Sequence, residues 1–115
     1  MSQGGVLDIG FKDKDVERLC SDVKHMTKKL GKPSAKKLRT RLNELWVAAN
    51  LSEVVSGRPH PLHNEFEGCF GLELAGGMRL VIEPNHSPLP LLDDGGLDRK
   101  LITSVCVVFV GDYHD

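Results

Sequence analysis

Three short groups of polar residues in this chain carry side chains suited to acid–base or phosphate chemistry. The first is His60-Pro61-Leu62-His63, the second is Arg79 in a mostly apolar stretch, and the third is Asp112-Tyr113-His114. A histidine titrates near neutral pH and can move a proton, and a guanidinium binds a phosphate through paired donors. These residue types are suited to phosphate binding and to acid–base chemistry.

Each group also has a purely structural interpretation. Arg79 can pair with Glu73 across a hairpin, and the terminal group can be a polar chain end. The HxxH spacing of His60 and His63 could contribute to a metal site with the terminal histidine. Pro61 disfavours a helix through the two histidines, and nothing else in the sequence completes a ligand set. We therefore predict no metal and no cofactor.

A fourth feature is a basic stretch over residues 28–41, which holds seven positive side chains and no acidic one. Residues 1–50 hold 11 Lys or Arg against 6 Asp or Glu, whereas residues 51–115 hold 4 against 10. The net charge of −1 therefore conceals an uneven distribution. Such a basic cluster can face a polyanion, or it can be the solvated surface of two helices.

The composition is that of an ordinary globular domain. The chain has 115 residues, of which 40% are apolar and 27% charged, so we expect a single domain over residues 1–115. The sequence contains no run of about 18 apolar residues, so we expect no membrane span. The first residues lack the pattern of a secretory signal. Cys20, Cys69 and Cys106 are far apart, which argues against a disulfide framework or a zinc ribbon and favours a cytoplasmic location.

Apolar periodicity predicts the elements that must position these groups. Alternation over residues 6–11 indicates a strand, and a stripe that begins after Asp13 indicates a helix of about 18 residues. Gly31 and Pro33 separate this helix from a second one, so the two form an antiparallel helical hairpin. The stripes consist of Val16, Leu19, Val23, Met26 and Leu30 in the first helix and Ala35, Leu38, Leu42, Leu45 and Ala49 in the second.

The second half of the chain has the alternation of an antiparallel sheet. Residues 69–74 and 78–83 form a predicted β-hairpin around a turn at residues 75–77. A long loop follows over residues 84–100, and the apolar, β-branched run 102–110 predicts a central strand buried on both faces. The order β-α-α-β-β-β predicts an α+β fold, in which the helical hairpin packs on one face of a small twisted sheet.

Six blocks of sequence, taken in their order and spacing, are similar to those of a known toxin family. They are Lys28-Lys29-Leu30-Gly31-Lys32, Ala35-Lys36-Lys37-Leu38-Arg39 with Arg41-Leu42-Asn43-Glu44-Leu45, His60-Pro61-Leu62, Arg79-Leu80-Val81-Ile82-Glu83-Pro84, Asp93-Asp94-Gly95-Gly96-Leu97-Asp98 and Asp112-Tyr113-His114. With the element order, they resemble the RelE/ParE superfamily of type II toxins over residues 6–114. The nearest resemblance is to HigB-like members, labelled plasmid maintenance system killer or killer suppression protein.

The resemblance implies an mRNA endonuclease that acts on translating ribosomes without a metal and is silenced by a cognate antitoxin, a HigA-like helix-turn-helix protein. In relatives the RNA 2′-hydroxyl attacks the adjacent phosphate and leaves a cyclic phosphate and a 5′-hydroxyl. Carried over to matching positions, Arg79 would clamp the phosphate and His60 would act beside it. His114 would transfer a proton with help from Asp112, and Tyr113 would stack on a base. The implied RNA and ribosome contacts are Lys28, Lys29, Lys32, Lys36, Lys37, Arg39, Arg41 and His63.

Two other functions stay open on the sequence alone. A non-catalytic member of the fold would act by binding a target, as ParE-like relatives bind gyrase. The overall charge favours this function, and so does His63, which stands where relatives usually have a lysine. The third function is that of an antitoxin or DNA-binding regulator, which the acidic second half and the lack of a helix-turn-helix pattern disfavour.

Overall fold

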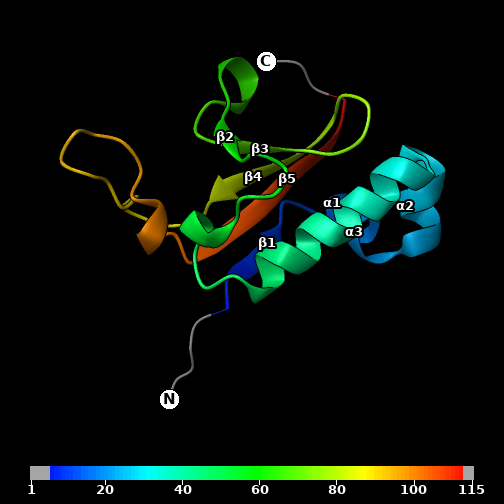
Figure 1. Cartoon of the computed structure of the whole chain (residues 1–115), viewed down its shortest axis with the longest axis horizontal. Coiled ribbons are helices and arrows are strands. Elements are labelled where there is room, and N and C mark those ends of the chain that lie inside the picture. Colours follow the sequence, from blue (N-terminus) through cyan, green and yellow to red (C-terminus); the bar gives the residue numbers. More distant parts are fainter. Residues whose placement is uncertain (1–5, 113–115) are drawn as a thin grey trace.

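A five-stranded mixed sheet forms one layer of the fold and three α-helices form the other (Figure 1). The computed structural model describes residues 6–112. The strand order is β1-β5-β4-β3-β2, with β1 parallel to β5 and the other neighbours antiparallel. The α+β class is confirmed. The elements are β1 (Asp8–Phe11), α1 (Lys14–Ser21), α2 (Val23–Leu30), α3 (Lys32–Val47), β2 (His60–Pro61), β3 (Phe70–Glu73), β4 (Met78–Pro84) and β5 (Ser104–Asp112), with three short 3₁₀ turns at Leu51–Glu53, Asn64–Phe66 and Arg99–Leu101.

The first predicted helix is in fact two helices, and the prediction of one continuous helix is wrong. Asp22 lies between α1 and α2 with extended backbone angles. Its N–H donates to the Arg18 carbonyl at the end of α1, while its carboxylate accepts from the His25 N–H, 3.2 Å away, at the start of α2. One aspartate therefore ends one helix and begins the next. The predicted cap at Asp13 is confirmed, since its Oδ1 accepts from the Val16 N–H at 2.9 Å.

The helical hairpin is confirmed between α2 and α3. Gly31 connects the two helices with a φ of +84°, which a glycine adopts without steric cost, and Pro33 lies in the first turn of α3. Leu38 and Leu45 of α3 are fully buried against the sheet. No helix within residues 6–112 combines the length and the apolar character that crossing a bilayer requires.

The β3–β4 hairpin has the predicted pairing and divides the sheet into two faces. Leu72 lies opposite Leu80, and Glu73 lies opposite Arg79. Because successive side chains of a strand alternate, these pairs belong to opposite faces. We call the face of Leu72 and Leu80 the helix face, because the helices cover it, and the face of Glu73 and Arg79 the outer face.

Strand β5 is central, but it is not equally buried on both faces, so that prediction is corrected. Val105 and Val107 on the helix face are fully buried, whereas Cys106 and Phe109 on the outer face are only half-buried. A bulge lies in β5 opposite the step between Val81 and Ile82. The helices cover only one face of the sheet. A strand with a continuous apolar sequence is therefore not always equally buried on both faces.

Two separate apolar clusters hold the fold together. The main cluster fills the space between the helices and the helix face. The second, which we call the outer cluster, lies under the segment that connects β2 to β3. It consists of Leu62, Cys69 and Val81, with Phe66, Val108 and Phe109 packed against them. This segment covers only part of the outer face.

The predicted long loop contains a small hairpin of its own, residues 88–98, which we call the arm. Leu91 and Leu97 form an antiparallel bridge, and the Asp98 N–H donates to the Pro90 carbonyl at 2.9 Å. His86 fixes the base of the arm, because its Nε2 accepts from the backbone N–H groups of Thr103 and Ser104 at 3.1 and 3.3 Å. In Figure 1 the arm projects from the sheet at the end away from α2.

Candidate functional site

Arg79 lies on the outer face as the second residue of β4, the central strand of the sheet, close to the β3–β4 turn. Its neighbours across the sheet are Glu73 on β3 and Gly111 on β5. The Nε atom of Arg79 is buried and has no hydrogen-bond partner. A buried polar donor without a partner is costly, and such groups are often completed by a ligand or by water.

The register that the sequence predicts for Arg79 and Glu73 is present, but the ion pair between them is not among those of residues 6–112. The carboxylate of Glu73 instead approaches Arg58, with 3.9 Å between Oε2 and Nε. The Glu73 main chain is also engaged, since its N–H donates to the Gly57 carbonyl and its own carbonyl accepts from Arg41. Cross-strand pairing therefore does not account for Arg79.

Gly111 and Phe109 shape the surface beside Arg79. A Cβ atom at Gly111 would lie 2.8 Å from the Phe109 ring, closer than side chains normally approach. The absence of a side chain at Gly111 thus leaves room for the Phe109 ring above β5, on the same face as Arg79. The ring also packs against Phe66, with 5.3 Å between the ring centroids. The sequence analysis missed both residues, although Phe-Val-Gly at the end of a predicted strand was a visible signal.

His60 lies on β2 at the edge of the same face, in register with Gly71. Its Nδ1 is 2.8 Å from the Arg58 carbonyl oxygen. A carbonyl can only accept, so Nδ1 must carry a hydrogen, and the lone pair of the neutral ring is on Nε2. Nε2 is therefore the nitrogen that can take a proton from another molecule.

The register also fixes the separation of His60 and Arg79. His60 is opposite Gly71, Gly71 is opposite Val81, and Val81 is two residues from Arg79 on one face. Two strand spacings and two rises along a strand give about 12 Å between the two Cα atoms. The two positions therefore lie on the same face, with one strand between β2 and β4.

Asp112 is placed differently from Arg79. It lies at the end of β5, exposed, in register with Met78. By strand alternation this position belongs to the helix face, so the structure does not bring Asp112 together with Arg79. Tyr113 and His114 lie outside the described residues.

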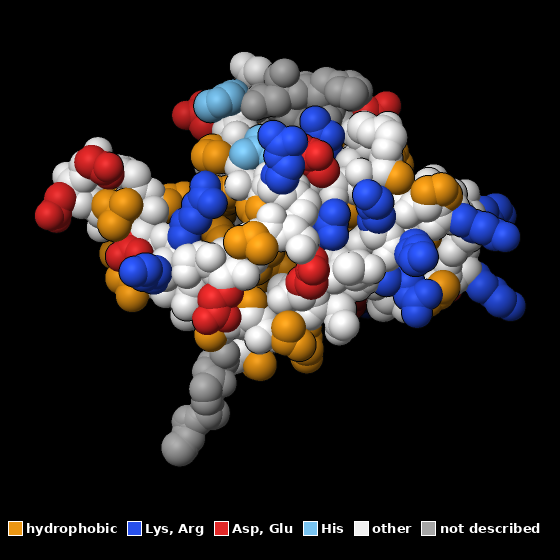
Figure 2. Space-filling view, in the orientation of Figure 1, with side chains coloured by type: hydrophobic (Ala, Val, Ile, Leu, Met, Phe, Trp, Pro, Cys, Tyr) orange, Lys and Arg blue, Asp and Glu red, His pale blue; other side chains and the backbone are white. Residues whose placement is uncertain are grey.

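The candidate RNA-binding residues lie mostly on one exposed surface. Figure 2 shows Lys and Arg side chains gathered over α2 and α3. His63 is apart from them, exposed where the β2–β3 segment begins a 3₁₀ turn. The exposed basic residues of the two helices are Lys24, Lys28, Lys29, Lys32, Lys36, Lys37 and Arg39.

Arg41 differs from the other basic residues of α3. Only 14% of its side chain is exposed. Its Nε donates to the Glu73 carbonyl at 3.1 Å, and its terminal nitrogen lies 3.6 Å from Glu44. This arginine ties α3 to β3, and it offers little of its charge to an external ligand.

The cysteines are poor candidates for nucleophiles. Burial raises the pKa of the Cys20 thiol to about 12, so the thiol stays protonated at neutral pH. Burial and the nearby carboxylate of Glu83 raise the pKa of Cys69 and Cys106 as well. Among residues 6–112 no three His, Cys, Asp or Glu side chains gather closely enough to hold a metal ion.

Compared with protein-family models, curated proteins and solved structures, the chain shows no significant match to any of them.

Proposed function

We propose that this protein is the toxin of a type II toxin–antitoxin module, with a RelE-like fold, and that it cuts mRNA on translating ribosomes. The similarity of the sequence blocks to HigB-like toxins supports this proposal. The observation that carries it is Arg79, a guanidinium with a buried, unbonded Nε on the half-covered outer face. No hydrogen bond within residues 6–112 satisfies that donor, and a shift of the half-buried side chain that exposed it would let a phosphate oxygen accept from it.

The proposed reaction needs no cofactor. The ribose 2′-oxygen attacks the adjacent phosphorus while a base takes the 2′-hydroxyl proton. The bond from phosphorus to the 5′-oxygen then breaks, and an acid protonates the leaving oxygen. The products are a 2′,3′-cyclic phosphate and a 5′-hydroxyl. Arg79 stabilises the negative charge that develops on the phosphorane, and the Nε2 of His60 is placed to accept the proton.

The remaining roles rest on the resemblance. His114 is the proposed partner in proton transfer, and Tyr113 stacks on a base. The resemblance also gives Asp112 an assisting role, which its place on the helix face disfavours. The exposed lysines of α2 and α3 bind ribosomal or messenger RNA through their charge. A HigA-like antitoxin is the proposed protein partner, and the cytoplasm, where ribosomes translate, is the proposed location.

The test is inducible expression of the chain, alone and with the adjacent gene. Expression alone is expected to arrest growth and to create new 5′-hydroxyl ends in mRNA, mapped by end-specific sequencing. Co-expression with the adjacent gene is expected to restore growth and to yield a co-purifying complex. Growth unaffected by the chain alone, in soluble folded form, would contradict the proposal.

A non-catalytic toxin that acts by binding is the second candidate. It is favoured by the position of Asp112, which belongs to the face opposite Arg79. This function predicts growth arrest without new mRNA ends, so the same end-mapping experiment separates the two.

A further inference from the structure

The arm combines exposed leucines with an acidic tip. Leu89, Leu91 and Leu92 are 44%, 58% and 48% exposed, which is high for three large apolar side chains so close together. Asp93 and Asp94 follow them at the turn. Residues 84–98 contain no lysine or arginine. Figure 2 shows acidic and apolar side chains together on this projection.

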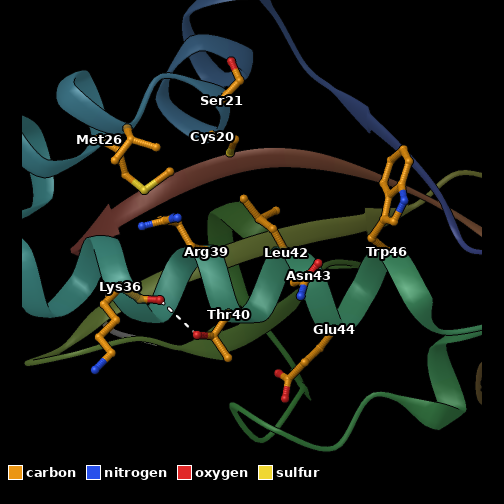
Figure 3. A pocket seen from close by; sticks show the side chains of 11 residues that line it. Cys20, Ser21, Met26, Lys36, Arg39, Thr40, Leu42, Asn43, Glu44 and Trp46 are labelled. Carbon is orange, nitrogen blue, oxygen red and sulfur yellow. Dashed lines mark hydrogen bonds between the residues drawn. The ribbon is translucent and has the colours of Figure 1, made fainter.

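A groove of about 760 Å³ lies between α3 and the pair α1 and α2, and its lining carries Lys36 and Arg39 against a single acidic residue, Glu44. Figure 3 shows Leu42 and Arg39 extending from α3 toward α1 and α2, with Trp46 at one end. Trp46 is 58% exposed, so the groove offers a large apolar side chain as well as positive charge. Lys36 lies on its rim.

The arm of a chain does not fill the groove of the same chain. The arm and α2 lie at opposite ends of the molecule in Figure 1. The groove residues Trp46 and Val23 remain exposed, as do the leucines of the arm. Both surfaces are thus available to another molecule.

We propose that the protein self-associates by docking the arm of one chain into the groove of a second copy. The leucines of the arm would cover Trp46 and its apolar neighbours, and Asp93 and Asp94 would face Lys36 and Arg39. Residues 24–41 hold eight positive side chains and no acid, so the field around the groove favours an acidic segment. Because arm and groove are different patches, the contact is head-to-tail. This inference does not depend on the proposed nuclease activity.

Two charge reversals test the proposal by sedimentation velocity at several protein concentrations. The wild-type chain is expected to show mass above the 12.7 kDa monomer, with association that weakens as salt is raised. The arm variant D93K/D94K and the groove variant K36E/R39E are each expected to associate about tenfold more weakly or worse, since like charges then face each other.

The decisive measurement is a mixture of the two variants. In the mixture the reversed arm of D93K/D94K can dock into the reversed groove of K36E/R39E. The native arm of K36E/R39E can likewise dock into the native groove of D93K/D94K, so association is expected to return to the wild-type level. The matched control is K12E/K14E, two reversals at exposed positions just before and at the start of α1, outside both the groove and residues 24–41, which is expected to associate like the wild type. Thermal unfolding checks that every variant is folded. The arm tip is exposed, so D93K/D94K tests the proposal even if the groove variant fails to fold.

Three results would overturn the proposal. The first is a wild-type chain that stays monomeric at all concentrations. The second is a folded D93K/D94K or K36E/R39E variant that self-associates as strongly as the wild type. This result would overturn self-association through the arm and groove even if the variant bound a different protein less well. The third is a mixture of folded variants that does not associate.

Discussion

The helix face and the outer face of the sheet bury very different amounts of apolar surface. The helix face carries the main apolar cluster, in which Leu72, Leu80 and Ile82 are fully buried under the helices. The outer face has a cluster of three buried residues and a half-buried arginine beside it. A face that is fully packed cannot admit a ligand, whereas a partly covered one can hold a polar group rigidly and still leave it accessible. We therefore expect stability to depend mainly on the helix face and activity on the outer face.

Removal of a histidine that we propose to transfer a proton is expected to have the largest effect, and this effect should fall on activity alone. His60→Ala should lower the cleavage rate about a hundred- to ten-thousand-fold, because Nε2 then no longer accepts the proton. The same range is expected for His114→Ala, from the resemblance. The measurement is mRNA cleavage on purified ribosomes, with the thermal unfolding curve as control. A folded His60→Ala protein that cuts at the wild-type rate would remove His60 from the mechanism.

Leu80→Ala tests the helix face at a position next to Arg79. Leu80 is fully buried, so truncation should cost about 2–5 kcal/mol of unfolding free energy through lost burial and a cavity. Chemical denaturation measures this loss directly. If the truncation lowered the unfolding free energy by much less than about 2 kcal/mol, the helix face would not be the main source of stability.

Arg79→Ala tests the outer face, at the residue next to Leu80, and is expected to change activity more than stability. Loss of the phosphate clamp should reduce cleavage about a hundred- to a thousand-fold, which corresponds to about 2.5–4 kcal/mol of transition-state stabilisation. Arg79→Lys should recover only part of the rate, because an ammonium cannot reproduce the paired donors of the guanidinium. Growth arrest and mapped mRNA ends measure the activity. Full toxicity in a folded Arg79→Ala chain would contradict the assigned role.

Gly111→Ala tests how the outer face is shaped. The new methyl group would meet the Phe109 ring, so the ring must move or the strand must shift, at about 1–3 kcal/mol. Gly10→Ala on β1 is the matched control, since its Cβ would meet nothing closer than 4.0 Å. Denaturation midpoints compare the two variants. Equal stability of both would show that the ring position is not constrained by Gly111.

Asp22 gives the helix layer a small pH dependence. The pKa of Asp22 is lowered, mainly by the hydrogen bond from the His25 N–H and also by the charge of Arg18. Because the folded pKa lies below the unfolded one, the stabilisation is present above the ordinary value of 3.8 and is lost as pH falls through the folded pKa. Asp22→Asn keeps an acceptor without the charge. It should lower the melting temperature slightly at pH 7, and the difference from wild type should shrink in acid. A constant difference would contradict this account.

The parts of the fold that follow from local patterns were predictable from the sequence. The β3–β4 hairpin was predicted because its alternation surrounds the Gly76-Gly77 turn. The break at Asp22 was not, because Leu19, Val23 and Met26 keep the period of a single helix through it. Strand β2 was also missed, since two residues are too short to show a period.

The candidate site was predicted in its residue types more than in its geometry. Arg79 and His60 were identified from their chemistry, and both lie on the outer face. That Glu73 would approach Arg58 instead of Arg79 depends on how the loop before β2 folds back, which no local pattern records. The face of Asp112 depends on the bulge in β5, because one extra residue reverses the alternation beyond it.

The parallel pairing of β1 with β5 has a consequence for how this chain folds during its own synthesis. Asp8 pairs with Ser104, so the first strand finds its partner almost one hundred residues later. Strand β5 separates β1 from β4 in the sheet, and it is the last of the described elements to leave the ribosome. Contacts between such distant segments form late. A nascent chain that ends before residue 104 lacks the strand that joins β1 to the rest of the sheet, so Arg79 has no β5 neighbour until residues 104–112 have been synthesised.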